Sequence, residues 1–276
     1  MSYQFGIECE VSSGAADVLT HLYNGGHVSD DHLHAYHCDC NACDHHRSGP
    51  DWTGQEDCTA DGEFVSRILT TGPEGDAALE AISAALIAGR ASHSERVGMH
   101  VHTDAGPFRE DNDALVRMWR LWLTYQDDVG ILARSHFSDV RSYNGPNVTK
   151  PHGGQPNVAG VLGYENADKV DRFFEAPPDE AVGMLEDWTR RGPRTGRWLS
   201  GGVDSGTFEF RLWNGTRSLW RIRMAVYVSV ALTTAALDGY EARPGDGKSL
   251  LDAIGDRLPD DVYMSVVKQL ASTEGL

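Results

Sequence analysis

The sequence is poor in basic residues and has no long apolar run. It holds 24 Lys and Arg against 41 Asp and Glu, which gives a formal net charge of −17. A nucleic-acid-binding surface needs a basic face to displace counterions, so this balance argues against a nucleic-acid partner. The longest apolar run, residues 224–237, is interrupted by Ser and Thr and is shorter than the roughly 20 residues of a membrane span. We therefore expect neither a nucleic acid nor a membrane as a partner.

Cysteine is also scarce, and its distribution is uneven. Four of the five cysteines lie within a short stretch that also holds many histidines. An odd total, with four of the five cysteines clustered, fits metal ligation in a reducing compartment better than a secreted disulfide framework. The first residues supply neither a basic n-region nor an apolar h-region, so we expect a cytoplasmic protein.

The Cys/His-rich segment, at about residues 27–58, has too few aliphatic residues in its first part to be ordered by burial. Cys38, Cys40, Cys43 and Cys58 offer four soft ligands, as a structural zinc site requires. Two alternatives stay open, namely an iron–sulfur cluster held by the same thiols and a flexible His-rich loop with free thiols.

A strand predicted over residues 5–11 places two carboxylates on one face. Successive side chains of a strand alternate between its faces, so Glu8 and Glu10 share one side while the apolar side chains between them face a core. This pattern alone is typical of any solvent-facing strand. Its meaning depends on the other strands that share the same sheet face.

Three further stretches bring polar side chains to the face of a strand. Glu63 lies on the return strand of a hairpin predicted over residues 52–69, with a turn at 59–62. His100 and His102 share a face of a strand over residues 97–103, and Glu209 and Arg211 share a face of a strand over 207–213.

The remaining patterns predict helices between these strands. They cover residues 12–22, 76–90, 113–134, 178–191, 218–237 and two short segments within 249–272. This order predicts an α+β fold with one open, functional sheet face, as a single domain over residues 1–276. The Cys/His-rich segment would be an insertion in that domain, and residues from about 240 to 276 would form a C-terminal helical segment.

Carboxylates gathered on one face raise each other's pKa unless cations lie among them. Oxygen ligands with one imidazole suit Mg²⁺ or Mn²⁺, which usually bridge to substrate phosphates. The combination of strands therefore indicates phosphoryl-transfer chemistry, in which catalysis is mainly positioning and neutralisation of charge.

The ordered set of motifs resembles the amidoligase family, a carboxylate-amine ligase group with the glutamine synthetase and glutamate–cysteine ligase fold. The motifs that carry the resemblance are Phe5-Gly6-Ile7-Glu8-Cys9-Glu10, Asp57 with residues 62–69, Gly98-Met99-His100-Val101-His102, Arg141 with Tyr143, and Thr207-Phe208-Glu209-Phe210-Arg211. Together they span roughly residues 3–235.

The resemblance implies a curved, mainly antiparallel sheet that forms an open funnel, with helices packed on its outer face. It also implies ATP-dependent joining of a carboxylate to an amine through an acyl-phosphate, on a small molecule or short peptide. Glu8 and Glu10 would ligate Mg²⁺ or Mn²⁺, with Glu63 at one cation and with His100 and Glu209 at the other.

The resemblance also implies residues that contact the nucleotide. Arg211 would hold the transferred phosphoryl group, and His102 would approach the nucleotide phosphates. Arg141 and Arg197 would make further phosphate or carboxylate contacts. One departure is Ser200, which stands where the family pattern Arg-x-x-Asn has Asn.

Two other classes of function stay open from the sequence. One is a zinc-dependent hydrolase in which His100, His102 and a carboxylate hold a catalytic zinc. The other is a non-catalytic binding protein that retains the ligase fold.

Overall fold

The computed structural model describes residues 2–35, 50–57, 60–94, 97–133, 167–191 and 198–274. These residues form an α+β fold with a mainly antiparallel sheet that does not close on itself, as the sequence predicts. The chain divides into two compact units, and the single domain expected from the sequence stays a prediction. The first unit comprises Met1–His102, Ala133–His152 and Trp213–Val226, and the second comprises Thr103–Leu132, Gly153–Leu212 and Tyr227–Leu276.

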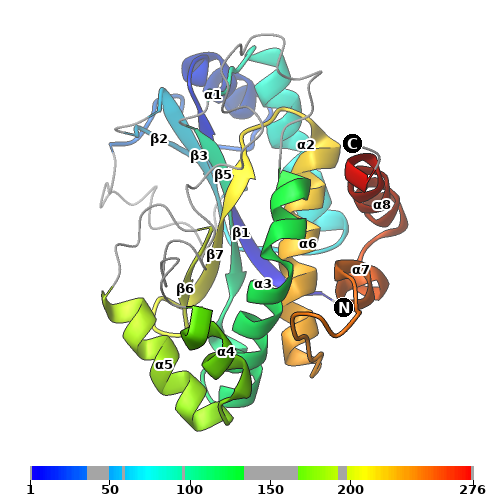
Figure 1. Ribbon diagram of the computed structural model, residues 1–276. Coiled ribbons are helices and arrows are strands. Elements are labelled where there is room, and N and C mark those ends of the chain that lie inside the picture. Colours follow the sequence, from blue (N-terminus) through cyan, green and yellow to red (C-terminus); the bar gives the residue numbers. More distant parts are fainter. Residues whose placement is uncertain are drawn as a thin grey trace. The chain divides into compact units, whose positions relative to one another are not determined.

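The first unit is built on strands that follow the order β2-β3-β1-β5 (Figure 1). The short strand β4 pairs with the end of β1 that β3 does not reach. β1 and β3 are antiparallel, and their register sets Glu10 opposite Glu63. The strand β5 begins in this unit and ends in the second. The bounds of the elements are β1 (Gln4–Val11), α1 (Ala15–Asn24), β2 (Trp52–Gln55), β3 (Gly62–Ser66), β4 (Leu69–Thr70), α2 (Pro73–Ala88) and β5 (Gly98–Asp104).

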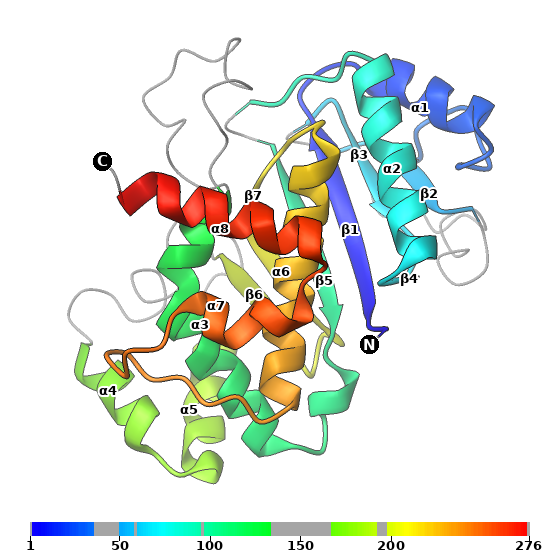
Figure 2. The same cartoon turned by 90° about the vertical axis from the view of Figure 1, so that its right-hand side faces the viewer.

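The core of the first unit lies between these strands and the helices α1 and α2, which pack together (Figure 2). The alternation predicted for β1 is confirmed, because Phe5, Ile7, Cys9 and Val11 are all buried. α1 and α2 meet closely at Gly89, where an added Cβ would lie 2.6 Å from the backbone N of Val18. A larger residue at Gly89 would therefore push the two helices apart.

Three element boundaries of the first unit differ from the sequence prediction. α1 begins at Ala15 rather than at residue 12, and the Ala15 amide donates to the carboxylate of Asp61 at 2.9 Å. α2 begins at Pro73, a favourable first helical position, three residues before the predicted start. The predicted return strand is interrupted after Ser66, and the next strand is the short β4.

The second unit contains the hairpin of β6 and β7 and most of the helices. The pairing of β6 with β7 is antiparallel. The sequence did not predict β6 or α4. The elements that lie wholly or partly in this unit are η2 (Gly106–Phe108), α3 (Asn112–Ala133), α4 (Ala167–Glu175), α5 (Pro178–Arg191), β6 (Leu199–Gly202), β7 (Thr207–Asn214), α6 (Leu219–Leu237), α7 (Leu250–Ile254), η5 (Gly255–Arg257) and α8 (Asp260–Glu274).

Aromatic contacts fix β7 in the second unit. Phe208 packs edge-to-face on Phe108 with ring centroids 5.0 Å apart, and Phe210 packs in the same way on Trp122 at 5.6 Å. These two phenylalanines alternate with the polar side chains of β7, so their burial directs Glu209 and Arg211 to the opposite face.

The helices of the second unit are joined by buried polar contacts. Arg120 of α3 donates to the carbonyl oxygens of Phe173 at 2.9 Å and Ala176 at 2.7 Å, and so caps the end of α4. Gln269 of α8 donates to the carbonyl oxygen of Leu132 at 3.1 Å near the end of α3. Each contact therefore links one helix to the C-terminal end of another.

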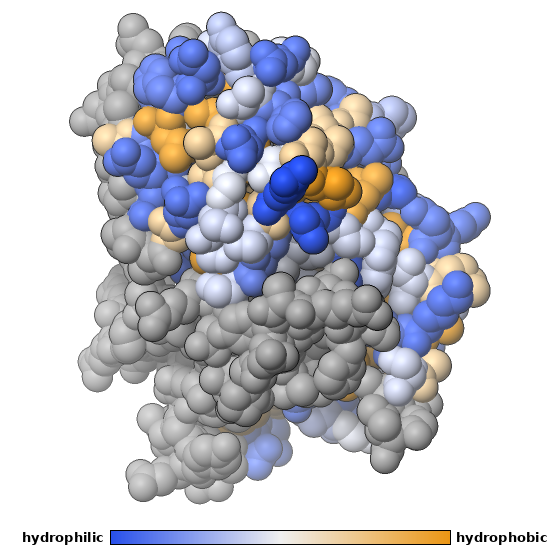
Figure 3. Space-filling view, turned by 90° about the horizontal axis from the view of Figure 1, so that it is seen from above, coloured by the Kyte–Doolittle hydropathy of each residue, from blue (hydrophilic) through white to orange (hydrophobic). Residues whose placement is uncertain are grey.

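The surface of the described residues mixes hydrophilic and hydrophobic side chains. On the face shown in Figure 3, small hydrophobic patches lie among hydrophilic residues. Large hydrophobic side chains that stay exposed in the first unit include Tyr23, Ile68 and Ile87. None of the helices in the described ranges has the length and apolar character needed to cross a bilayer.

Candidate functional site

The centre of the candidate site is a buried group of two carboxylates and one imidazole in the first unit. Glu10 comes from β1, Glu63 from β3 and His100 from β5, and each of the three residues is less than 8% exposed. One ligand atom from each residue lies within 4.8 Å of the others. The structure therefore brings together three of the residues that the sequence predicts as cation ligands.

Glu8 lies beside this group and is held by both histidines of β5. Its Oε2 lies 2.8 Å from Nδ1 of His100, and its Oε1 lies 3.1 Å from Nε2 of His102. Burial raises the pKa of the Glu8 carboxyl, but the hydrogen bonds and charges of the two histidines outweigh burial and lower the pKa well below its usual range. Glu8 therefore remains ionised at neutral pH.

The contacts of β1 with β5 show why the sequence pattern brings these groups together. The amide of Gly98 donates to Glu10 Oε2 at 2.6 Å, His100 contacts Glu8, and an added Cβ at Gly6 would lie 3.8 Å from Cβ of His102. In these contacts the residue numbers increase along β5 as they decrease along β1, so the two strands are antiparallel. With a period of two on each strand, the acidic and imidazole side chains share one face, as predicted.

Glu63 shows the electrostatic strain of this group. Burial raises the pKa of Glu63, and the nearby charges of Glu8, Glu10 and Asp57 raise it further, to about 8. Because Glu63 stands directly opposite Glu10 in the register, two like charges would otherwise face each other across neighbouring strands. A proton or a cation at this point relieves the repulsion.

Cys9 lies on the opposite side of β1, within the core. Burial raises the pKa of its thiol, and the charges of Glu63, Glu8 and Glu10 raise it further. The thiol is therefore protonated at neutral pH, and Cys9 behaves as a small apolar core residue.

The donor set fits a hard divalent cation. Carboxylate oxygens are the preferred protein ligands of Mg²⁺, and an imidazole nitrogen beside them is compatible with Mn²⁺. Nδ1 of His100 faces Glu8, whereas its Nε2 lies 3.8 Å from Oε1 of Glu10. A carboxylate on one imidazole nitrogen, with the other nitrogen turned toward the ligand group, is how metal-binding histidines are usually oriented.

The second unit holds other residues of the predicted site, on β6 and β7. Arg211 donates to Oε1 of Glu209, and the hydroxyl of Ser200 donates to Oε2 of Glu209 at 2.7 Å. All three side chains are less than one third exposed. Within this unit, the structure brings together the predicted cation ligand, the predicted phosphoryl-contacting arginine and the one residue that departs from the family pattern.

Several predicted residues lie outside the described residues. They are Arg141, Arg197 and the four candidate zinc ligands, Cys38, Cys40, Cys43 and Cys58.

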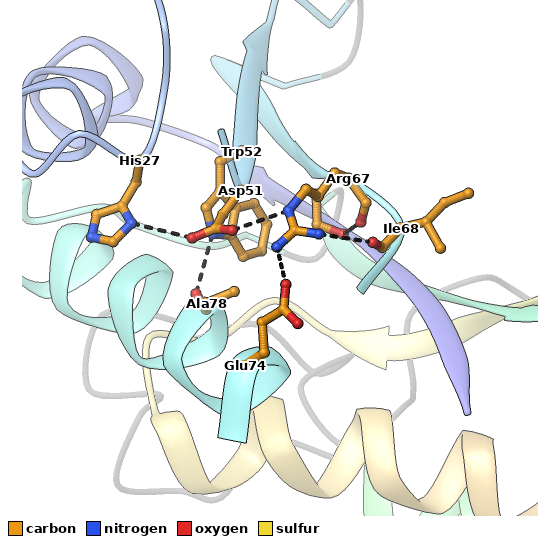
Figure 4. A network of polar contacts seen from close by, with 8 residues as sticks. His27, Asp51, Trp52, Arg67, Ile68, Glu74 and Ala78 are labelled. Carbon is orange, nitrogen blue, oxygen red and sulfur yellow. Dashed lines mark hydrogen bonds and ion pairs between the residues drawn. The ribbon is translucent and has the colours of Figure 1, made fainter. Parts of the chain in front are cut away.

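Residues near the two ends of the Cys/His-rich segment form a polar network in the first unit (Figure 4). Asp51 accepts from Arg67 Nε at 3.2 Å and lies 3.4 Å from Nδ1 of His27, while Arg67 also donates to Glu74 at 2.5 Å. The backbone N of Trp52 donates to the carbonyl oxygen of His27 at 3.0 Å. The two sides of the segment are thus joined to each other.

Histidines next to this network do not by themselves form a three-ligand site. His34 is buried and lies 3.3 Å from Asp30, and its ring centroid is 4.9 Å from that of His32. In the part of the chain that the structure describes, no cluster of three close His, Cys or acidic side chains includes these residues. A zinc site in this region would need at least one ligand from outside the described residues.

Two features of the site were not predicted from the sequence. The first is that Glu8 bridges both histidines, which depends on the register of β1 against β5. The second is the contact between Ser200 and Glu209, for which the only available signal was the unexpected Ser in the family pattern.

Comparison with known proteins adds no further assignment. No protein-family model matches the chain, and no curated protein sequence matches it. The resemblance to the amidoligase family therefore rests on the motifs themselves.

Proposed function

We propose that this protein is an ATP- and Mg²⁺-dependent carboxylate-amine ligase with a glutamine synthetase-like fold, in which the curved sheet forms an open funnel. It would join a carboxylate to an amine, on a small molecule or a short peptide. The carboxylate oxygen attacks the γ-phosphorus of ATP, ADP leaves, and the amine then displaces phosphate from the acyl-phosphate.

The observation that carries this proposal is the buried group of Glu10, Glu63 and His100. Burial of two carboxylates side by side is costly unless a cation or a proton compensates their charge. The three ligand atoms lie within 4.8 Å of one another, close enough for one divalent cation. Glu10, Glu63 and His100 would hold this cation, which would supply positive charge to stabilise phosphoryl transfer.

The family resemblance implies roles for the other residues, and one contact adds a second role for Glu8. Glu8 orients His100, since it lies 2.8 Å from Nδ1 of that imidazole, and would itself ligate a cation. Glu209 would be a ligand of the second cation, and Arg211 would contact the transferred phosphoryl group. His102, Arg141 and Arg197 would contact the nucleotide or the substrate carboxylate.

A hydroxylamine trap tests the ligase directly. The protein is incubated with ATP, Mg²⁺, hydroxylamine and pooled amino acids or other carboxylic acids, and ADP and hydroxamate are measured. We expect carboxylate-dependent ADP release, which Glu10→Gln abolishes. Glu80→Gln is the matched control, because it makes the same chemical change at an exposed position of α2. If folded protein releases no ADP with any acid in the pool, the ligase proposal fails.

The zinc-dependent hydrolase is less well supported. It needs His100, His102 and a carboxylate around one metal, yet among the described residues no close three-ligand group includes His102. Metal analysis separates the two sites. We expect tightly bound zinc to be lost only with the cysteines of the Cys/His-rich segment, whereas loss of zinc from His100→Ala or His102→Ala would support the hydrolase.

A non-catalytic binding protein makes a different prediction for Glu209. If the protein only binds nucleotide, Glu209→Ala should bind ATP as the wild type does. We expect instead that Glu209→Ala weakens Mg²⁺-dependent ATP binding, measured by calorimetry.

A further inference from the structure

The hairpin of β6 and β7 has a turn that fixes its register. The chain reverses over residues 203–206, where the hydroxyl of Ser205 accepts from the backbone N of Gly202 at 2.9 Å. Gly201 has a φ of +79°, and an added Cβ there would lie 2.3 Å from the carbonyl oxygen of Thr207. Only glycine fits this backbone next to the turn.

This register places Ser200 directly opposite Glu209. A slip by one residue would send the side chains of β6 to the other face of the sheet. In the observed register both side chains lie on the same face, and Ser200 Oγ donates to Oε2 of Glu209 at 2.7 Å. Ser200 is only 8% exposed, so water competes poorly for this hydrogen bond.

The Glu209 carboxylate is held at both of its oxygens. Ser200 donates to Oε2 from the neighbouring strand, and Arg211 donates to Oε1 from two residues further along β7. Two donors at different oxygens restrict rotation of the carboxylate plane. A carboxylate has about four lone-pair sites, so these two hydrogen bonds are compatible with a cation ligated by the same group.

We propose that Ser200 is a positioning residue, whose hydroxyl holds Glu209 in the orientation that binds a divalent cation. The inference rests on the proposed function, in which Glu209 is a cation ligand. Ligands that are oriented by outer hydrogen bonds bind metals more tightly, because less freedom is lost on binding. Serine at this position would then replace the expected Asn as the hydrogen-bond donor to Glu209.

Binding of Mn²⁺ alone, without nucleotide, tests the role of the hydroxyl. Mn²⁺ affinity is measured by equilibrium titration with detection of free Mn²⁺ by electron paramagnetic resonance. Ser200→Thr keeps the hydroxyl, and Ser200→Val has the shape of the Thr side chain without a hydroxyl. Both Thr and Val are common in strands. Glu209→Gln identifies the part of the binding curve that depends on Glu209.

We expect Ser200→Thr to bind Mn²⁺ as the wild type does and Ser200→Val to bind the Glu209-dependent Mn²⁺ about tenfold more weakly. Ser200→Asn should also retain affinity, because its amide can donate to Glu209. Urea unfolding shows whether Ser200→Thr and Ser200→Val are both folded and equally stable. If Ser200 had only a structural role, two variants of equal stability would bind Mn²⁺ equally well.

The outcomes distinguish the two proposals. Equal Mn²⁺ affinity of folded Ser200→Thr and Ser200→Val, together with weaker binding by Glu209→Gln, would overturn the role of Ser200 and leave the proposed function standing. Absence of Mn²⁺ binding by the wild type, or no effect of Glu209→Gln, would overturn the proposed cation site and the role of Ser200 with it.

Discussion

Replacement of Glu63 by Gln should make the stability of the metal-free protein less sensitive to pH. Glu63 is 7% exposed and lies among carboxylates that raise its pKa from 4.5 to about 8. The folded protein therefore binds a proton that the unfolded chain releases. The stability that this proton contributes is complete below about pH 4.5 and is lost as the pH rises toward 8.

The size of the effect follows from the pKa difference. Each pH unit between the two pKa values lowers the free energy of unfolding by about 1.4 kcal/mol. From about pH 6 to about pH 7.5, ionisation of Glu63 should therefore cost the metal-free wild type about 2 kcal/mol. Glu63→Gln has no proton to lose at this position and should not show this part of the decrease.

Urea unfolding in the presence of a chelator measures this difference, with tryptophan fluorescence as the signal. Glu80→Gln, at an exposed position, should follow the wild type. Mg²⁺ or Mn²⁺ should restore the stability of the wild type at the higher pH, because a ligand that binds only the folded state stabilises it. Parallel pH dependence of wild type and Glu63→Gln without metal would refute the reasoning.

Three further substitutions test the packing, each by urea unfolding. Trp52→Phe removes the hydrogen bond from Nε1 to the carbonyl oxygen of Ala78, 3.1 Å away and buried, and should cost about 1–2 kcal/mol. Arg120→Met leaves two buried carbonyl oxygens at the end of α4 without their donor and should cost about 2–3 kcal/mol. Gly89→Ala places a Cβ 2.6 Å from the backbone N of Val18 and should cost about 1–3 kcal/mol. A change below about 0.5 kcal/mol, the usual range for surface substitutions, would contradict the contact concerned.

Strands with strict alternation were predictable, whereas irregular ones were not. β1 and β7 alternate apolar and polar residues, so the faces of Glu8, Glu10, Glu209 and Arg211 follow from a period of two. β6 was missed because two of its four residues are glycines, which have low strand propensity. Its existence depends on pairing with β7, a tertiary contact.

The ends of helices are also hard to predict from the sequence, because they depend on tertiary contacts. Ser12 and Ser13 are good capping residues by type, yet α1 begins at Ala15, where the acceptor is Asp61 from a distant part of the chain. The sequence alone predicts that the acidic and imidazole groups share one face of the sheet. It does not predict which carboxylate contacts which imidazole. That detail depends on strand register, which turns and distant contacts determine.

The paired backbone near the two ends of the Cys/His-rich segment has a consequence for protein engineering. The backbone N of Trp52 donates to His27, the backbone N of His34 donates to Gly54 of β2, and the backbone N of Glu56, just after β2, donates to His34. Because residues before and after positions 36–49 are bonded to one another, closing a loop of different length between them would carry little additional entropic cost. Exchanging positions 36–49 for a foreign peptide removes Cys38, Cys40 and Cys43 and leaves the carboxylates of β1 and β3 as they are, so it separates the proposed zinc from the proposed ligase site.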